Sequence, residues 1–558
     1  MLKRGELYSI HQSMKNKFEE MKDIYKDVRD FIYPYFGRFD DENPNTSNRH
    51  DEYFLKTTPI SYANVFASGL QSGITSPTKK WFKLKVSDDQ LMRDSQVRTW
   101  LAQVEQIVYD MLYKGHFYQE NYQNNLELGL VGTSAMMISS DAKTGIRCYG
   151  FTCGEYYLDS NQYNEIDTFS RKFKVTAKQL CEIFGDRVPE DIKAERKNPS
   201  SHRYYTVYQL ILPNQYYEPG SKNNQRFPYA EYIWTDADEK LVLMSGYHEF
   251  PIIVSRWFVK PNSLYGYGAG IWSVRSAREL QLVQKNIMQM AELTANPPLQ
   301  APSDIMANGG VNLLPSRVNY YNPVGGSSGM ITPILDGRSF QIEQVMLHRQ
   351  ELEEEMKLHF HYDVFKLISD MDKGTRTARE IVELNAEKMG QLGALLDRIE
   401  TEVLPSILRR VLSIGFRSNL FPQAPDSIQG AELSVEFESQ LSQAQRQSDI
   451  TPIIDTLTTA INIASTAQIP EVLDTIDFDE AIDSIATLNG INPRILKPRD
   501  QVMKIRQQRA QQQQMLMEQQ TQMNEAEMAK TASQAKMDEP SALTQVLGGA
   551  VPNALESY

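Results

Sequence analysis

The chain has 558 residues, of which 41% are hydrophobic and 10% aromatic, and its formal net charge is −13. This aromatic content is too high for a mostly disordered chain, and the length corresponds to roughly three or four domains of ~150 residues. The negative charge argues against a simple DNA-binding protein, whose surface would be basic. Three cysteines are too few for a disulfide framework or a four-thiolate zinc site. No apolar run approaches the ~20 residues that a membrane-spanning helix needs.

The N-terminal part is predicted to be helical. Apolar residues recur at three- and four-residue spacing from Leu7 to Phe31, and Pro34 ends this amphipathic pattern. The residue patterns predict further helices over 57–77, 95–114 and 117–131, and a strand over 134–140.

Residues 134–259 change character, because short β-branched and aromatic runs alternate there with turn-forming clusters. This pattern is typical of an antiparallel, partly exposed β region. One short helix, 176–185, interrupts the strands and ends at Gly185.

The second half returns to helical patterns. A helix over 271–296 is stopped by two prolines, and residues 297–340 are rich in proline and glycine with room for short strands only. A second helix starts near Phe340, and the two helices could pack as an antiparallel pair. Later helical patterns cover 376–415, with a bend expected at Pro405, and then 449–487 and 499–539. The last of these, rich in Gln, Met and Ala, is either disordered or a helix that needs neighbours from other subunits.

Motifs for catalysis are weak. Gly266, Gly268 and Gly270 resemble a dinucleotide-binding turn, but Ile271 occupies the place of the third glycine. These glycines are better explained as a tight turn that lets a strand and a helix meet closely. His359 and His361 are two residues apart and would point to different sides of a helix. We therefore predict no catalytic site, no cofactor and no metal.

Charge is concentrated in one segment. Residues 341–372 carry eight acids and three bases, a local charge of −5. On its own, such a run usually marks a solvated helix face. The segment includes the second helix of the predicted pair, and this position becomes informative beside the order of the other segments.

Five strings in a fixed order carry a resemblance over residues 20–415. They are FIYPYFG, ANVFASGLQSGITSP followed by WFKL, LGLVGTSAMMI, EFPIIVSRWFVKPNSLYGYGAG before SARELQLVQKNIMQMAELTANPPL, and GTRTAREIVELNAEKM. In this order they resemble the portal proteins, or head-to-tail connectors, of short-tailed (podovirus-type) bacteriophages.

The resemblance implies an α+β, mainly α, portal fold that assembles into a dodecameric ring around a central channel. The implied parts are a wing (1–265), stem helix 1 (266–296), a β-rich clip (297–340), stem helix 2 (341–368), a tunnel loop (369–377), a long wing helix (378–423), a crown (424–500) and a Gln/Met-rich C-terminal helix and tail (501–558).

The resemblance also implies a structural function without catalysis. The ring would sit at one capsid vertex of the virion, where double-stranded DNA is packaged and later ejected, and would be present in the host cytoplasm during assembly. Its implied partners are the terminase large subunit, tail adaptor and tail proteins, and the major capsid and scaffolding proteins, with which it would nucleate the procapsid. No membrane is involved.

A channel should let DNA slide, and an acidic wall repels phosphates where basic contacts would add affinity. Screening limits this repulsion to about 8–10 Å at physiological salt, so only acids that face the channel matter. The candidate channel-facing residues on the second stem helix are Glu351, Glu354 and Glu355. The tunnel-loop candidates are Asp370, Asp372, Lys373, Arg376 and Arg379. The candidates for partner docking in the clip are Leu314, Arg317, Tyr320 and Tyr321.

Two alternatives stay open at this point. The acids and lysine of 189–193 faintly resemble the acid-x-lysine arm of some nucleases, and a nucleic-acid-processing enzyme would cleave DNA or hydrolyse ATP. A helical scaffold or internal virion protein would instead form extended or disordered particles without a central hole.

Overall fold

The computed structural model describes residues 2–39, 54–92, 94–196, 203–236, 242–295, 299–300, 332–333, 342–371, 397–428, 433–437, 440–467, 475–488 and 499–534. The chain divides into two compact units, Met1–Thr475 and Ile476–Tyr558. The described part is mainly helical and also contains antiparallel sheets, which confirms the predicted α+β class.

The N-terminal helices follow the apolar patterns of the sequence. Helix α1 (Arg4–Phe31) buries the predicted stripe, including Leu7, Met14 and Val28, and Glu6 accepts the backbone N–H of Lys3 at its start. The other helices of this part are α2 (Thr58–Ile74), α3 (Asp89–Met92), α4 (Ser95–Lys114), α5 (Phe117–Val131), α6 (Ala177–Phe184) and α7 (Glu190–Arg196).

Two antiparallel sheets form the β region, as predicted. Five strands pair in the order β4-β5-β6-β7-β8 and three in the order β3-β2-β9. Their bounds are β2 (Thr133–Asp141), β3 (Gly145–Phe151), β4 (Tyr156–Ser160), β5 (Ile166–Thr176), β6 (Tyr204–Pro213), β7 (Tyr229–Thr235), β8 (Val242–Tyr247) and β9 (Ile252–Arg256). Short 3-10 turns are η1 (Gly185–Arg187), η2 (Asn224–Arg226) and η6 (Asp426–Ile428).

A two-stranded sheet joins distant parts of the chain. Strand β1 (Phe82–Val86) pairs antiparallel with β12 (Leu433–Phe437), and Phe82 lies opposite Phe437. A second short pair, β10 (Leu299–Gln300) with β11 (Thr332–Pro333), lies within the region predicted to be β-rich. No local pattern predicted the β1–β12 pair, because its strands are about 350 residues apart.

The later helices are α8 (Ala269–Ala295), α10 (Ile342–His359), α11 (Tyr362–Met371), the π-helical turn η5 (Ile399–Val403), α13 (Leu404–Arg417) and α14 (Gln440–Ala467). The second unit contains α15 (Phe478–Leu488) and α16 (Arg499–Gln534). No helix in the described ranges is both long and apolar enough to cross a membrane.

The sequence predicted one helix over 341–368 as the second member of the pair, whereas the structure has two helices there. Helix α10 ends at His359, His361 adopts a left-handed conformation (φ 48°), and α11 then continues to Met371. The break brings two buried rings onto α2, since Phe360 and Phe365 lie 6.4 and 4.9 Å from the ring of Phe66. The start of the expected tunnel loop, 369–371, is therefore helical.

Two further expectations are corrected. Instead of a simple bend at Pro405, the chain forms the π-helical turn η5 just before α13. Pro405 lacks an N–H and would crowd the preceding turn, and the wider π turn relieves this conflict. The pattern over 449–487 corresponds to two helices, α14 and α15, which belong to different units.

The C-terminal pattern over 499–539 forms a helix, α16, over Arg499–Gln534. Several of its apolar residues are exposed within this chain, among them Met515 at 68% and Leu516 at 61%. Arg506 pairs with Asp479 of α15 at 2.6 Å.

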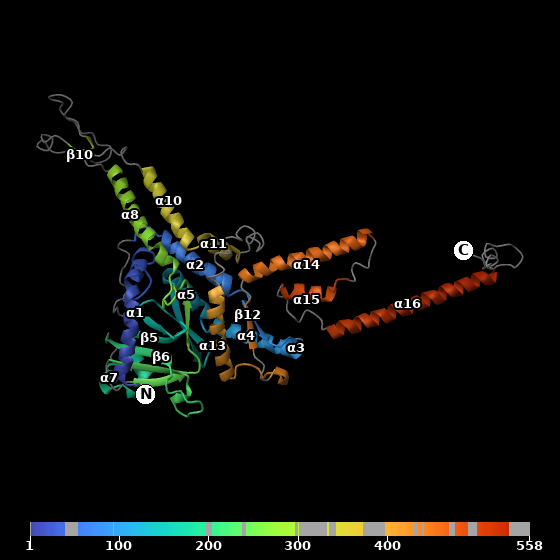
Figure 1. Ribbon diagram of the computed structural model, residues 1–558, viewed down its shortest axis with the longest axis horizontal. Helices are drawn as coiled ribbons and strands as arrows, with labels where there is room; N and C mark the ends of the chain where they lie inside the picture. The colour runs from blue at the N-terminus through green and yellow to red at the C-terminus, as the bar shows by residue number, and fades with distance from the viewer. Residues whose placement is uncertain are drawn as a thin grey trace, which may run out of the picture. The chain divides into compact units, whose positions relative to one another are not determined.

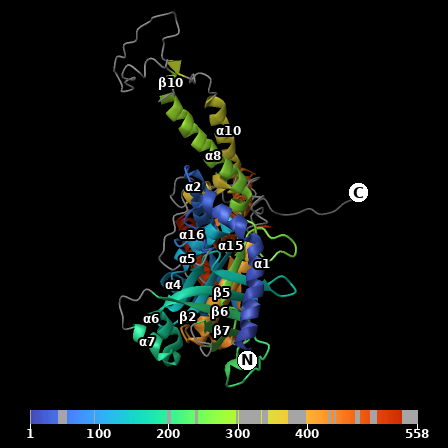
Figure 2. The same cartoon turned by 90° about the vertical axis from the view of Figure 1, so that its left-hand side faces the viewer.

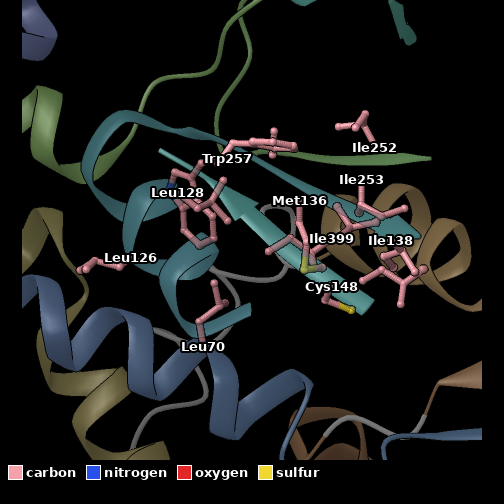
Figure 3. Close-up of a cluster of buried hydrophobic side chains, with 14 of the residues drawn as sticks. Leu70, Leu126, Leu128, Met136, Ile138, Cys148, Ile252, Ile253, Trp257 and Ile399 are labelled. Atoms are coloured by element: carbon pink, nitrogen blue, oxygen red, sulfur yellow. The ribbon is translucent and has the colours of Figure 1, made fainter. Parts of the chain in front are cut away.

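The core lies between the three-stranded sheet and the helices α2 and α5. Figure 3 shows side chains from these elements, including Leu70, Leu128 and Met136, together with Ile399 of the π-helical turn. Unlike the other helices, α5 is buried on nearly all sides, so its polar residues also need partners inside. Asn121 donates to Thr75 Oγ1 at 2.9 Å.

The glycines after β9 bring two backbones into contact, as predicted. A carbon added to Gly268 would lie 2.6 Å from the backbone nitrogen of Gly132, and one added to Gly270 would lie 2.4 Å from the carbonyl oxygen of Leu130. Both contacts are with backbone at the C-terminal end of α5. Any side chain at these positions would push α8 away from α5.

Gly268→Ala should therefore destabilise the fold by about 1–3 kcal/mol or more, because a methyl group would overlap backbone atoms that cannot rotate away. The midpoint of chemical unfolding, followed by tryptophan fluorescence, measures this loss. Gly5→Ala is the matched control, since nothing lies within 4 Å of an added carbon there. An unchanged midpoint for Gly268→Ala would contradict the close contact.

Glu127 is a buried carboxyl on α5 with an unusual proton affinity. It is 8% exposed and accepts the backbone N–H of Cys153 at 3.0 Å. Burial raises the pKa of Glu127 to about 8, and hydrogen bonds from Thr152 and Cys153 offset only part of that effect. The folded chain therefore holds this carboxyl in its neutral form at pH 7.

Replacing Glu127 by glutamine should remove a pH-dependent loss of stability. Because the pKa rises from 4.5 to about 8 on folding, the free energy of unfolding of the wild type falls as the pH rises through this window. An amide oxygen can still accept the Cys153 N–H but has no proton to lose. Glu127→Gln should be more stable than the wild type by several kcal/mol, on the order of 3–5, near pH 9.

Urea unfolding at a series of pH values measures this difference. Glu120→Gln, on the same helix, is the control and should keep the wild-type slope because Glu127 remains. A Glu127→Gln profile that falls as steeply as that of the wild type would show that another group causes the pH dependence.

Candidate channel site: the paired helices α8 and α10

Helices α8 and α10 lie side by side and lead away from the sheets (Figures 1 and 2). Leu280 and Val283 of α8 and Leu352 and Met356 of α10 are buried. These residues recur at three- and four-residue spacing, so each helix buries one apolar side. The predicted antiparallel pair is therefore confirmed.

Three polar contacts fix the register of the pair. Ser273 Oγ lies 3.1 Å from His359 Nδ1, and Ser276 Oγ donates to Glu355 Oε2 at 2.7 Å. Farther along, Glu279 Oε1 lies 2.8 Å from His348 Nε2. Residue numbers rise along α8 as they fall along α10, which is the signature of antiparallel packing.

The pair is anchored to the body through α8. Gln281 Oε1 accepts the backbone N–H groups of Leu55 and Lys56, each at 2.8 Å. Arg278 pairs with Asp27 at 2.7 Å and its guanidinium lies over the Phe31 ring. These contacts bind α8 to α1 and to the segment before α2.

The three carboxylates predicted to face the channel do not form one cluster. Glu355 is used within the pair, where it accepts from Ser276. Glu354 forms an ion pair with Lys357, one turn farther along the same helix. Glu351 has a 77% exposed side chain and lies 3.5 Å from His348. Glu351, Glu354 and Glu355 are all exposed, but the carboxylate of Glu355 is held by Ser276 of α8.

Sequence reasoning missed the apolar part of this outward face. Leu347 and Leu358 are 59% and 70% exposed, and with Glu351 and Glu354 they follow a spacing of four, three and four residues. Such a spacing places all four on one side of a helix, with the leucines flanked by carboxylates. We call these four residues the α10 outer stripe. Their spacing was visible in the sequence, but the buried stripe of α10 masked it.

The outward side of α8 carries the opposite charge. Arg275 and Lys285 are exposed around Leu282, whose side chain is 57% exposed. We call these three residues the α8 outer face. The α8 outer face thus carries two cations around its leucine, with the exposed Glu279 beside them, and the α10 outer stripe carries two carboxylates between two leucines.

Two histidines respond differently to their surroundings. The hydrogen bonds to Glu279 and Glu351 raise the pKa of His348, which favours its charged form between the two acids. Burial lowers the pKa of His359, which lies between the helices beside Ser273. His359 and His361 do not form a joint site.

The remaining predicted residues fall largely outside the described ranges. Asp370 belongs to α11, and nothing is described of its side chain. The residues outside the described ranges are Asp372, Lys373, Arg376 and Arg379 of the expected tunnel loop and Leu314, Arg317, Tyr320 and Tyr321 of the expected clip.

Both acids of the nuclease alternative, Glu190 and Asp191, lie on α7. Glu190 has an 86% exposed side chain and pairs with Lys193 at 2.8 Å on the helix surface. Within the described ranges, no three His, Cys, Asp or Glu side chains are placed to hold a metal ion. The three cysteines are buried and free.

Comparison with known proteins agrees with this architecture. The family model of the bacteriophage head to tail connecting protein matches residues 4–496. The chain is 31% identical over 541 residues to the portal protein of Salmonella phage epsilon15, covering 96% of each chain. It is 28% identical over 512 residues to the probable portal protein of Bordetella phage BPP-1, covering 91% of each. The chain therefore belongs to the family of bacteriophage head-to-tail connecting proteins.

Proposed function

We propose that copies of this chain form a closed dodecameric ring at one capsid vertex and that double-stranded DNA passes through its central channel. The helices α8 and α10 form the stem of each copy in this arrangement. Residues 1–265 with the long wing helix expected over 378–423 form the wing, residues 297–340 the clip, and residues 424–500 the crown. The ring acts structurally, and a separate ATPase supplies the energy for packaging.

The observation that carries this proposal is the match between the two outward surfaces of the stem. A closed ring needs two different surfaces on every copy, one for each neighbour. The α10 outer stripe offers leucines bordered by carboxylates, and the α8 outer face offers a leucine bordered by cations. Packing one against the other buries apolar side chains and brings opposite charges together.

The charge of α10 also suits a DNA channel. Glu351 and Glu354 lie between Leu347 and Leu358 on the α10 outer stripe, and in the single copy their side chains are 77% and 65% exposed. Carboxylates along the channel repel the phosphates and leave DNA without a binding site there. The acidic composition, which first argued against DNA, is in this setting compatible with a protein that DNA passes.

The partners follow from the same proposal. The clip docks the terminase large subunit during packaging and a tail adaptor afterwards, and Tyr320, Tyr321, Leu314 and Arg317 are its candidate contacts. Contacts with scaffolding and major capsid proteins place the ring in the procapsid, in the host cytoplasm. The acidic and basic residues of 369–379 are candidates for transient contacts with DNA.

Charging the stripe should prevent ring formation. The double variant Leu347→Asp and Leu358→Asp places four carboxylates side by side, so copies should stay separate where the wild type forms annuli with a central hole. Light scattering and negative-stain electron microscopy of the full-length protein measure this. Tyr113→Asp on α4, whose tyrosine is 74% exposed, is the control and should still form rings. Intact rings from the double variant would refute the interface, and extended particles from the wild type would favour a scaffold.

Reversing the charge of Glu351 and Glu354 should impede DNA passage. Lysines at both positions would bind phosphates, so the packaging rate should fall several-fold and recover partly as salt rises. Packaging into procapsids that contain the variant rings measures the rate. Glu190→Lys with Glu218→Lys, two exposed acids outside the stem, is the matched control. An unchanged packaging rate at low and high salt would place these glutamates away from the channel.

A further inference from the structure

A cleft of about 760 Å³ lies where β9, the turn between β4 and β5, and the start of α13 meet. Its volume falls within the range of sites that bind small molecules. It lies in the wing part of the chain and shares no lining residue with α8 or α10. Nothing in the proposed channel function accounts for it.

A buried arginine at the end of β9 lines this cleft. The side chain of Arg256 is only 9% exposed, and its Nη2 donates to the backbone carbonyl of Asn164 at 3.0 Å. The other terminal nitrogen, Nη1, is fully buried and has no hydrogen-bond partner among the described residues. An unsatisfied buried guanidinium N–H is costly, so this atom calls for an acceptor.

The carboxylate of Glu402 lies near Arg256, but Glu402 also lies near a second arginine and is too far from either for a short hydrogen bond. Glu402 of the π-helical turn lies 3.8 Å from Arg256 Nη2 and 3.7 Å from Arg398 Nε. Charge-assisted hydrogen bonds between such groups usually measure about 2.7–2.9 Å. Glu402 therefore lies between two guanidiniums without closing a short bond to either.

The other charges that line the cleft leave a surplus of cations. Arg410 is satisfied by Glu249 at 2.9 Å, whereas Arg409 is exposed on the same helix. Glu165 accepts from Asn161 in its own turn. Burial lowers the pKa of His248, which keeps that ring neutral at pH 7. Four arginines thus face three glutamates across the cleft.

The π-helical turn gives the cleft its polar wall. Ser406 Oγ donates to the carbonyl oxygen of Glu402 at 2.7 Å, and Thr401 Oγ1 donates to that of Asp397 at 2.8 Å. Both hydroxyl groups belong to residues that line the cleft. A π turn costs helix stability, and such turns are frequent at functional sites.

We propose that this cleft binds a small oxyanion, a phosphate or carboxylate group, with Nη1 of Arg256 as its buried donor and Arg398 and Arg409 as the cations at its mouth. The oxyanion supplies the acceptor that Arg256 lacks and balances the surplus charge. This site is separate from the DNA channel and does not depend on it.

The same chemistry has two sources, a free phosphate ion or an acidic side chain of an adjacent copy. If the anion is free, both the ring and the separated copies bind inorganic phosphate. If an adjacent copy supplies it, the ring has the site filled and only the Leu347→Asp and Leu358→Asp variant, as separate copies, binds the added anion.

Isothermal titration calorimetry of the full-length protein with sodium phosphate, and separately with glutarate as a dicarboxylate probe, tests the proposal at constant ionic strength. We expect saturable binding of at least one probe to the ring or to the separate copies. Arg256→Met should weaken it at least about tenfold, because a charge-assisted hydrogen bond to a buried donor is lost. Arg187→Gln removes an exposed arginine outside the cleft and should bind as the wild type does.

If Arg256→Met fails to fold, the double variant Arg398→Gln and Arg409→Gln carries the test and should weaken binding several-fold. Binding of neither probe to either form of the protein would overturn the proposal. Equal affinity in the wild type and in a folded Arg256→Met variant, or in the double variant where only that one folds, would overturn it as well.

Discussion

The position of the stem depends on a contact between two pieces of backbone. The residues just before α8 and in its first turn lie against the end of α5, where Gly268 and Gly270 meet Gly132 and Leu130 without side chains between them. Helix α5 is itself buried in the core, so it acts as a fixed support. The direction of α8 is set at this point, and α10 follows it through the contacts of Ser273, Ser276 and Glu279. The segment Gly266–Gly270, which resembles a nucleotide-binding turn in the sequence, thus allows α8 to pack closely against α5.

The polar and charged residues of the stem form two sets, one between the two helices and one on their outer surfaces. Between the helices, polar groups pair across the contact, as Glu355 does with Ser276. On the outside, Arg275 and Lys285 of α8 and Glu351 of α10 are exposed, whereas Glu354 and Glu279 already contact Lys357 and His348 within one copy. An assembling protein is expected to expose apolar and charged groups that find their partners only on another copy. The exposed Leu347 and Leu358 support the same conclusion, since nothing in the described chain covers them.

Much of the fold was predictable where local signals decide it. Helix α4 occupies the predicted residues 95–114 because Asp94 caps its first turn, accepting from Gln96 at 2.9 Å, and Gly115 follows its last residue. Strand β5 was missed because its basic residues obscured the alternation, although Arg171 packs over the Phe173 ring at 4.1 Å and so behaves as part of a packed surface. The β1–β12 pair was beyond local reasoning altogether. Of the site, the acidic helix was predictable, but the bond between Ser276 and Glu355 depends on α8 and appears only in three dimensions.

The contrast between two arginines near α13 shows how the wing uses buried charge. Arg410 donates to Glu249 at 2.9 Å and to the carbonyl of Ile138 at 3.2 Å, and Arg417 adds two more bonds to the same carboxylate. Although burial alone would raise it, the bonds from Arg417 and Ser413 lower the pKa of Glu249 to about 2, so this carboxylate stays ionised well below neutral pH. It ties α13 to the sheet through fully paired groups. Arg256, the last residue of β9, is also buried, but its Nη1 lacks such a partner. What distinguishes Arg256 is that it lines a cleft with a surplus of arginines, where an oxyanion can supply the missing acceptor.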